Sequence, residues 1–214
     1  MAGTRDYTEE EIAVVRKSFS GRFALRDRGY FEMALQLGLR VSELLSLKVA
    51  DVWQYGAVVD EVWIERKHMK GGKAGKASGR VLPIFPETKP HILARLQRLA
   101  GMLHVKDLRR LDPDLPLFLS RVKGNDGTRR PISREQAWRI CKGIARENEL
   151  PGKIGTHSTR KTLARRAYAH SKDLRFVQKI LGHRSIASTE CYVTTLTDRE
   201  AWASFRAAVQ PAAA

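Results

Sequence analysis

Apolar residues recur at helical spacing along much of the chain and identify its first elements. Thr8 and Glu11 form a capping-box pattern ahead of an apolar series, which predicts a first helix. A second helix is predicted over residues 25–37, with Gly38 as its C-terminal stop. A short apolar helix is predicted directly afterwards, over residues 42–47.

The middle and the end of the chain contain three further amphipathic helices. Residues 86–103 form the most regular of them, and its apolar positions indicate core packing. Ser133 caps the next helix, on whose apolar face Cys141 is expected to fill the core. Residues 198–209 carry a third apolar face through Trp202, Phe205 and Val209.

Alternating and branched residues predict strands in three places. Residues 58–66 and 80–84 are expected to form a hairpin, and residues 117–120 a short buried strand. The connector between the first two reads K-H-M-K-G-G-K-A-G-K-A-S-G. Because it holds four lysines, four glycines and no acid, it is predicted to be a flexible hairpin tip.

Length and composition narrow the function classes. A chain of 214 residues suffices for one domain with a real core, and at most for one large plus one small. The sequence contains neither an apolar run long enough to span a bilayer nor the apolar core of a signal peptide. Its two cysteines are too few for a disulfide framework or a Cys-rich zinc site. The net charge of +16 favours a polyanionic partner, with nucleic acid ahead of an acidic membrane.

Candidate chemistry is concentrated between residues 156 and 194. His157 and Arg160 are three residues apart and share one face of a helix, and His183 follows a predicted helix end. Tyr192 comes nine residues after His183. From His157 through Arg184 there are eight Lys or Arg residues and one acid. Histidines, arginines and a tyrosine on a basic surface indicate chemistry on a phosphodiester.

These residues resemble the catalytic half of the tyrosine recombinases, the lambda-integrase family. H-S-T-R at residues 157–160, L-G-H-R-S at residues 181–185 and Tyr192 are similar to the family pattern H-x-x-R, L-G-H and a nucleophilic tyrosine. G-L-R-V-S-E-L-L-S-L-K-V-A-D-V, over residues 38–52, resembles the family's first arginine box. The resemblance implies the fold of the family's catalytic domain, mostly α with a small antiparallel β-sheet (α+β).

The resemblance also assigns roles to single residues. Arg40 and Arg160 would hold the scissile phosphate with forked donors, and Tyr192 would attack it. His157 is the expected general base, and His183 would hydrogen-bond the phosphate. The chemistry requires no metal and no other cofactor.

Two further assignments depend on neighbouring residues. Glu43, one turn after Arg40, is expected to orient it, although a plain first-turn acid has the same spacing. Lys70 on the hairpin tip is the expected proton donor to the leaving 5′ oxygen, with Lys67 as the alternative. Further contacts to DNA phosphates are expected from Lys67, Lys73, Lys76, Arg129, Arg130, Lys161, Arg165 and Arg184.

The implied organisation is a catalytic domain over residues 1–197 and a tail helix over residues 198–214. The tail would dock on a neighbouring protomer or pack on its own domain. The family's N-terminal core-binding domain is expected to be absent, in an excised domain or a naturally short member. The implied partners are double-stranded DNA and three copies of the same chain, which form a homotetramer on the DNA. No membrane contact is expected. The expected location is the cytoplasm of a prokaryote, on the nucleoid or a plasmid.

Three other functions remain open at this point. A type IB topoisomerase-like relaxing enzyme shares the chemistry, and an inactive DNA-binding regulator shares the fold. The intact set of Arg40, His157, Arg160, His183 and Tyr192 argues against the regulator. A generic RNA-binding domain is disfavoured because the usual aromatic stacking motif is missing.

Overall fold

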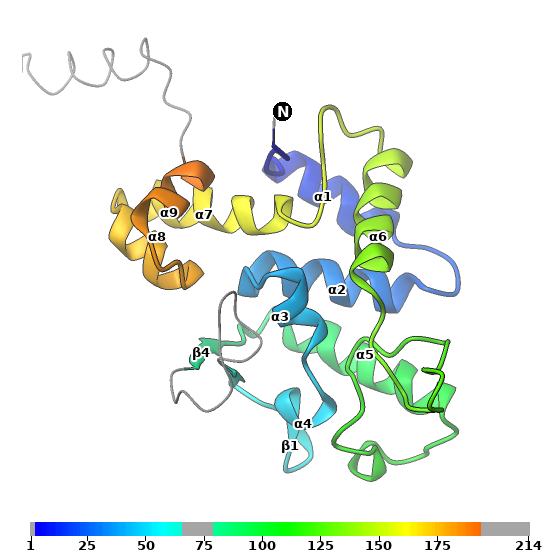
Figure 1. Ribbon diagram of the computed structural model, residues 1–214. Coiled ribbons are helices and arrows are strands. Elements are labelled where there is room, and N and C mark those ends of the chain that lie inside the picture. Colours follow the sequence, from blue (N-terminus) through cyan, green and yellow to red (C-terminus); the bar gives the residue numbers. More distant parts are fainter. Residues whose placement is uncertain (1–2, 66–78, 194–214) are drawn as a thin grey trace, which may run out of the picture.

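The computed structural model describes residues 3–65 and 79–193, and Figure 1 shows their helices gathered around a central one. Four strands form two small antiparallel ladders, β1 with β2 and β3 with β4. The strands are β1 (Trp53–Gln54), β2 (Ala57–Val58), β3 (Glu61–Ile64) and β4 (Arg80–Pro83). The helices are α1 (Glu9–Ser18), α2 (Ala24–Leu37), α3 (Val41–Leu45), α4 (Val49–Val52), α5 (Lys89–Met102), α6 (Arg134–Glu147), α7 (Ser158–Ser171), α8 (Leu174–Leu181) and α9 (Ile186–Val193).

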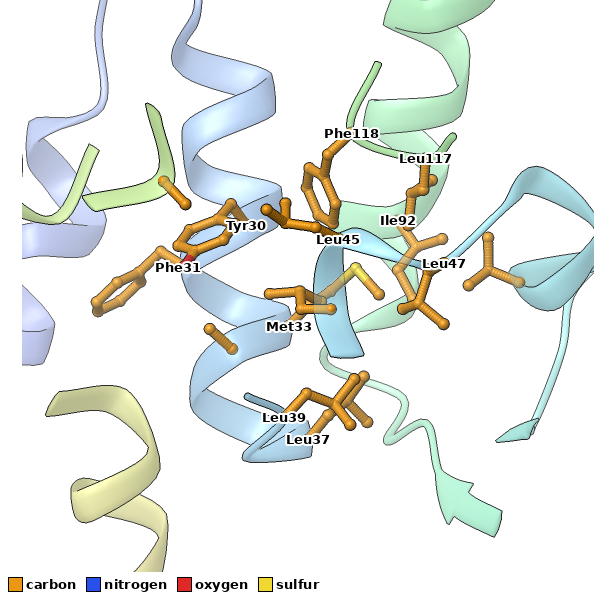
Figure 2. Packing of buried hydrophobic residues seen from close by; sticks show 14 of the residues in the cluster. Tyr30, Phe31, Met33, Leu37, Leu39, Leu45, Leu47, Ile92, Leu117 and Phe118 are labelled. Carbon is orange, nitrogen blue, oxygen red and sulfur yellow. The ribbon is translucent and has the colours of Figure 1, made fainter. Parts of the chain in front are cut away.

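Helix α2 lies at the centre of the core. Eight of its fourteen residues are buried, and both α5 and α7 pack against it. Figure 2 shows its side chains among those of α3, α5 and the segment before α6, with Tyr30, Phe31, Met33, Leu45, Leu47, Ile92, Leu117 and Phe118 labelled. Because α2 is fixed on several sides, the residues that follow its C-terminus are fixed as well.

The helix ends follow the predicted signals. Thr8 Oγ1 accepts from the backbone of Glu11, and the Glu11 carboxylate accepts from the backbone of Thr8, so the predicted capping box is confirmed. Helix α2 ends at Gly38, whose φ of 55° is the left-handed conformation that favours glycine. The helices predicted near residues 86–103 and after Ser133 are α5 and α6, and Cys141 is buried in the core.

The predicted strand over residues 58–66 is wrong in its extent. Val58 belongs to β2, which pairs with β1 through a tight turn at Tyr55 and Gly56. Both turn residues have positive φ, which matches the right-handed twist of a two-residue hairpin. The chain then bends, and β3 starts only at Glu61 to pair with β4.

The predicted strand over residues 117–120 is also wrong. The segment is buried as expected, but it makes only isolated bridges, between Lys48 and Pro116 and between Leu119 and Pro131. Proline has no N–H to donate, so neither bridge extends into a ladder.

The segment before α1 is fastened to α7. The backbone N–H of Tyr7 donates to Thr162 Oγ1 at 2.9 Å, and both groups are buried. Arg165 Nε donates to the Asp6 carboxylate at 2.6 Å, and Arg166 pairs with Glu9. The start of the described chain and the helix that follows His157 therefore form one packed unit.

Two predicted features lie outside the described residues. They are most of the lysine-rich connector, residues 66–78, and the tail from residue 194 onward with its apolar face at Trp202, Phe205 and Val209. Within residues 3–65 and 79–193, every helix is too short or too polar to cross a bilayer.

Gly38 gives a direct test of this architecture. A Cβ there would lie 2.4 Å from Leu163 Cδ2, in a backbone conformation that L-residues rarely adopt. We expect Gly38→Ala to lower the free energy of unfolding by about 1–2 kcal/mol in urea titrations. Gly101→Ala, in α5 with open space around it, should instead raise it by up to about 1 kcal/mol. Equal effects of both changes would contradict the assigned end of α2.

Candidate active site

Tyr192 and His157 meet at the open side of the α7–α9 cluster. Tyr192 lies in the last turn of α9, and His157 is the N-cap residue of α7. The Tyr192 hydroxyl is 2.8 Å from His157 Nδ1. In the tautomer protonated at Nε2, Nδ1 is free to accept the hydroxyl proton. The structure thus places the predicted nucleophile and the predicted base in direct contact.

The surroundings of His157 keep its ring neutral. Partial desolvation lowers the pKa of this exposed residue below the usual value near 6.5, and the positive charges of Arg160, Arg40 and Lys161 lower it further. A neutral ring at pH 7 has a free acceptor nitrogen, which a general base requires. Arg160 and Lys161 also lie near the Tyr192 ring, each with its charged group 5.9 Å from the ring centroid.

Arg160 is fully buried and joins the ends of two helices. Its Nη1 donates to the carbonyl of Gly38 after α2, and its Nη2 donates to the carbonyl of Leu181 at 2.5 Å. Burial and the nearby Arg40 lower its pKa to about 10, so it stays charged at pH 7. Its Nε has no partner among the described residues, and these bonds use two of its five N–H groups. The remaining donors suit a phosphate oxygen.

Arg40 is held by the carboxylate of Glu43, as the sequence predicts. The Glu43 side chain is fully buried; Oε1 accepts from Arg40 Nη1, and Oε2 accepts from the Arg40 backbone N–H, both at 2.9 Å. The backbone bond ties the carboxylate to the start of α3, so the Arg40 fork is fixed relative to the helix.

Arg80 is a member of this site that the sequence interpretation missed. Arg80 Nη2 donates to Glu43 Oε2 at 3.2 Å, and Nη1 donates to the carbonyl of Ile180 at 3.0 Å. The backbone of Gly182 passes close by, since a Cβ there would lie 2.8 Å from Arg80 Nη1. Arg80 therefore connects the β3–β4 ladder to α3 and to the end of α8. Its position at the start of a predicted strand gave no signal of this role.

His183 is also held by residues that the sequence did not single out. Its Nδ1 lies 3.0 Å from Thr189 Oγ1, and Gln178 Nε2 donates to its carbonyl at 3.1 Å. Burial lowers the His183 pKa to about 3, with further lowering by the charges of Arg160 and Arg40. The ring is neutral at pH 7 and its centroid is 5.0 Å from that of Tyr192.

The remaining predicted DNA contacts differ in their surroundings. Arg165 is engaged by Asp6, by Glu9 and by the carbonyl of Tyr7, so a phosphate contact would require an exchange of partners. Arg130 pairs with Asp126 at 3.0 Å. Two further residues are exposed, Arg129 and Arg184. Three lie outside the described residues, namely Lys67, Lys73 and Lys76, as does Lys70, the predicted proton donor.

Comparison with known proteins gives one family match and many relatives. The model of the phage integrase family matches residues 7–199. The tyrosine recombinase XerD of Xanthomonas axonopodis pv. citri is 34% identical over 179 residues, which are 82% of this chain and 52% of the relative. The tyrosine recombinase XerC of Herpetosiphon aurantiacus is 32% identical over 89% of this chain and 55% of the relative. The chain spans about half the length of these curated relatives.

Solved structures agree on the fold. The crystal structure of the XerA recombinase has a TM-score of 0.69 at 21% identity, over 99% of this chain and 68% of that one. The Tn1549 transposon integrase in complex with circular intermediate DNA has a TM-score of 0.70 at 16% identity, over 98% and 68%. These likenesses establish the predicted fold class, mostly helical with small antiparallel sheets.

The contacts of Arg80 predict that it acts through Glu43. We expect Arg80→Gln to lower the free energy of unfolding by about 2–3 kcal/mol, because Glu43 loses one of two cationic partners in a buried place. Urea titration measures this loss. As a matched control, Arg109→Gln removes the exposed ion pair with Asp107 and should leave the urea midpoint unchanged. Equal midpoints for both variants would contradict the structural role of Arg80.

Proposed function

The chain belongs to the phage integrase family, and from this we propose that it is a site-specific recombinase that cleaves and rejoins double-stranded DNA. The intermediate is a covalent 3′-phosphotyrosine on Tyr192. The observation that carries the proposal is the 2.8 Å contact between the Tyr192 hydroxyl and His157 Nδ1 beside Arg160. This contact supports the roles proposed for Tyr192 as nucleophile, His157 as base and Arg160 as phosphate-binding donor.

In the proposed cleavage step, the Tyr192 oxygen attacks phosphorus and the bond from phosphorus to the 5′ oxygen breaks. The hydroxyl proton passes to His157 Nδ1. A free tyrosine has a pKa near about 10, so this transfer needs a base in contact with the hydroxyl. The departing 5′ oxygen takes a proton from Lys70 on the hairpin.

Fixed cations stabilise the charge that develops on the phosphate oxygens. Arg160 is preorganised by two backbone carbonyls and Arg40 by Glu43, so neither must reorganise during the reaction. Preorganised donors of this kind contribute on the order of 3 kcal/mol each, roughly a hundredfold in rate. His183, neutral and fixed by Thr189, adds a ring N–H toward the same oxygens.

The phosphotyrosine retains the energy of the broken bond. A new 5′ hydroxyl can therefore attack it, which returns the proton to Tyr192 and reseals DNA without ATP. Known relatives are recombinases and integrases, which favours strand exchange over relaxation by a topoisomerase-like enzyme.

The assembly that we propose is a homotetramer on two DNA sites, with the tail over residues 198–214 docked on a neighbouring protomer. The relatives are bacterial proteins, which supports action in a bacterial cytoplasm on chromosomal or plasmid DNA. The catalytic domain over residues 1–197 would supply each active site. The basic charge of the chain supports duplex binding that weakens steeply with salt.

Tyr192→Phe tests the nucleophile. The variant should form no covalent adduct with a nicked suicide duplex, because only the attacking oxygen is removed, and its duplex affinity should stay within about twofold of the wild type. Denaturing electrophoresis measures the adduct and fluorescence anisotropy the affinity. Tyr168→Phe, in α7, is the matched control and should retain adduct formation. Adducts that persist in the Tyr192→Phe variant would place the nucleophile elsewhere.

Lys70→Ala tests the proton donor. Cleavage of ordinary DNA should slow by about two orders of magnitude, the usual contribution of general acid catalysis. A duplex with a 5′-bridging sulfur should be cleaved at nearly the wild-type rate, because a thiolate leaves without a proton. Single-turnover rates on the two duplexes provide the comparison. Selective rescue of Lys67→Ala, in place of Lys70→Ala, would transfer the role to Lys67.

A further inference from the structure

A second concentration of positive charge lies at the opposite end of α2 from Arg40. It is a cavity of about 270 Å³ between the start of α2, α5 and the segment after Phe118. Five arginines and no carboxylate line it, together with Phe23, Met102 and Leu119. We call it the arginine cavity, and its arginines are Arg22, Arg26, Arg95, Arg98 and Arg121.

Arg95 is the buried member of the arginine cavity. Its side chain is 1% exposed, and Nε donates to the carbonyl of Leu117 at 2.8 Å. Its Nη2 is buried and has no hydrogen-bond partner among the described residues. Burial lowers the Arg95 pKa to about 10, and the charges of Arg26 and Arg98 lower it further, while the nearby Asp27 carboxylate offsets part of this effect. A buried guanidinium with unused donors and cationic neighbours is costly unless an anion joins it.

The other arginines are partly preorganised at the cavity mouth. The guanidinium carbons of Arg22 and Arg26 lie 4.6 and 4.4 Å from the centroid of the Phe23 ring. Such stacking restricts two long side chains without using their N–H groups. Arg26 Nε also donates to the Asp27 carboxylate at 2.7 Å, so this carboxylate is already paired. Arg98 and Arg121 form no ion pair with a carboxylate in residues 3–65 or 79–193.

A larger cleft lies next to the arginine cavity. A cleft of about 860 Å³ along α6 shares Arg22, Phe23, Arg26 and Arg121 with it. Six arginines and two carboxylates line this cleft. Arg26, Arg130 and Arg139 are paired with carboxylates, and the other three, Arg22, Arg121 and Arg146, leave an excess of positive charge that favours a polyanion. The cavity itself has room for a hydrated oxyanion, since one water occupies about 30 Å³ of liquid.

We propose that the arginine cavity is a second phosphate site, which binds a tetrahedral phosphate group through Arg95, Arg98 and Arg121. Forked guanidinium donors match phosphate oxygens in geometry and charge. The position favours a phosphate of the DNA backbone as its source, a point that rests on the proposed function. Arg26 lies in the first turn of α2 and Arg40 follows its C-cap residue, Gly38. The fourteen residues of this helix span about 21 Å, so one rigid helix connects the two sites.

The first experiment measures inorganic phosphate binding to the free protein by calorimetry, with chloride at equal ionic strength as reference. It uses an Arg40→Gln background, because the candidate active site also attracts phosphate. Combining Arg98→Gln with Arg121→Gln should weaken phosphate binding about tenfold or more, as expected for lost charged hydrogen bonds. Combining Arg109→Gln with Arg110→Gln removes the same number of exposed positive charges outside the cavity and should have no effect. If Arg98→Gln plus Arg121→Gln leaves phosphate affinity unchanged, the site does not exist.

The second experiment identifies the source. Single methylphosphonates, which carry no charge, are scanned along a duplex that contains the cleavage site. One substitution outside the cleavage position should weaken binding of the wild type but not of the Arg98→Gln/Arg121→Gln variant. The dependence of log affinity on log salt concentration should also be shallower for that variant, by the equivalent of about one or two phosphate contacts. Phosphate binding without such a coupled position would overturn the DNA source and leave a free phosphate compound as ligand.

The two proposals fail in different ways. Adduct formation by the otherwise unmodified chain on a suicide duplex reports on the recombinase function alone. A chain that forms adducts but shows equal phosphate affinity with and without the two arginine changes would retain its function and lose the second site. A chain that binds phosphate in the arginine cavity but forms no adduct would keep the site and lose the function.

Discussion

The complete burial of the Arg160 guanidinium is the constraint on which the candidate active site depends. A buried cation needs partners, and the carbonyls of Gly38 and Leu181 supply them from the ends of α2 and α8. These two helix ends must therefore converge on the start of α7. Desolvation lowers the pKa of the His157 and His183 rings, and the fixed positive charge of Arg160 lowers both further, so the rings stay neutral. One buried side chain thus sets both the geometry and the protonation states.

The positive charges of the candidate active site are compensated unevenly by carboxylates. Arg40 and Arg80 share the carboxylate of Glu43, whereas Arg160 relies on neutral carbonyl oxygens. Carbonyl dipoles hold a guanidinium in place without cancelling its charge, so a positive field remains for an incoming phosphate. Had a second carboxylate bound Arg160, the side chain would be better compensated but the phosphate would be repelled. The arrangement therefore exchanges some stability of the free protein for affinity toward an anion.

Much of the fold and of the site could be predicted from the sequence because local signals were strong. The capping box at Thr8, the stop at Gly38 and the spaced apolar residues of α5 each act within a few residues of chain. The three short motifs identified His157, Arg160, His183 and Tyr192, and the structure brings these together around Arg40.

What could not be predicted depends on contacts between distant segments. Arg80 looks like any strand residue until the fold places it against Glu43 and Ile180. The segment around Leu119 has the composition of a strand, but its neighbours offer prolines at the bridge positions, so no ladder forms. Thr189 matters only because α9 turns it toward His183. Spacing along the chain contains none of this information.

The attachment of the N-terminal segment to α7 has a mechanical consequence. Arg5, Tyr7 and Glu9 each contact a residue that precedes or belongs to the helix that begins after His157. Tension applied to the chain at Arg5 would load the contacts of Arg5 and Tyr7 before it reached α1, and that of Glu9 at the first residue of α1. The load path then passes along α7, past the ring that contacts the Tyr192 hydroxyl. A force on the chain before Arg5 would therefore be transmitted to the contact between His157 and Tyr192. Strain in the protein and strain in bound DNA would then act on the same atoms.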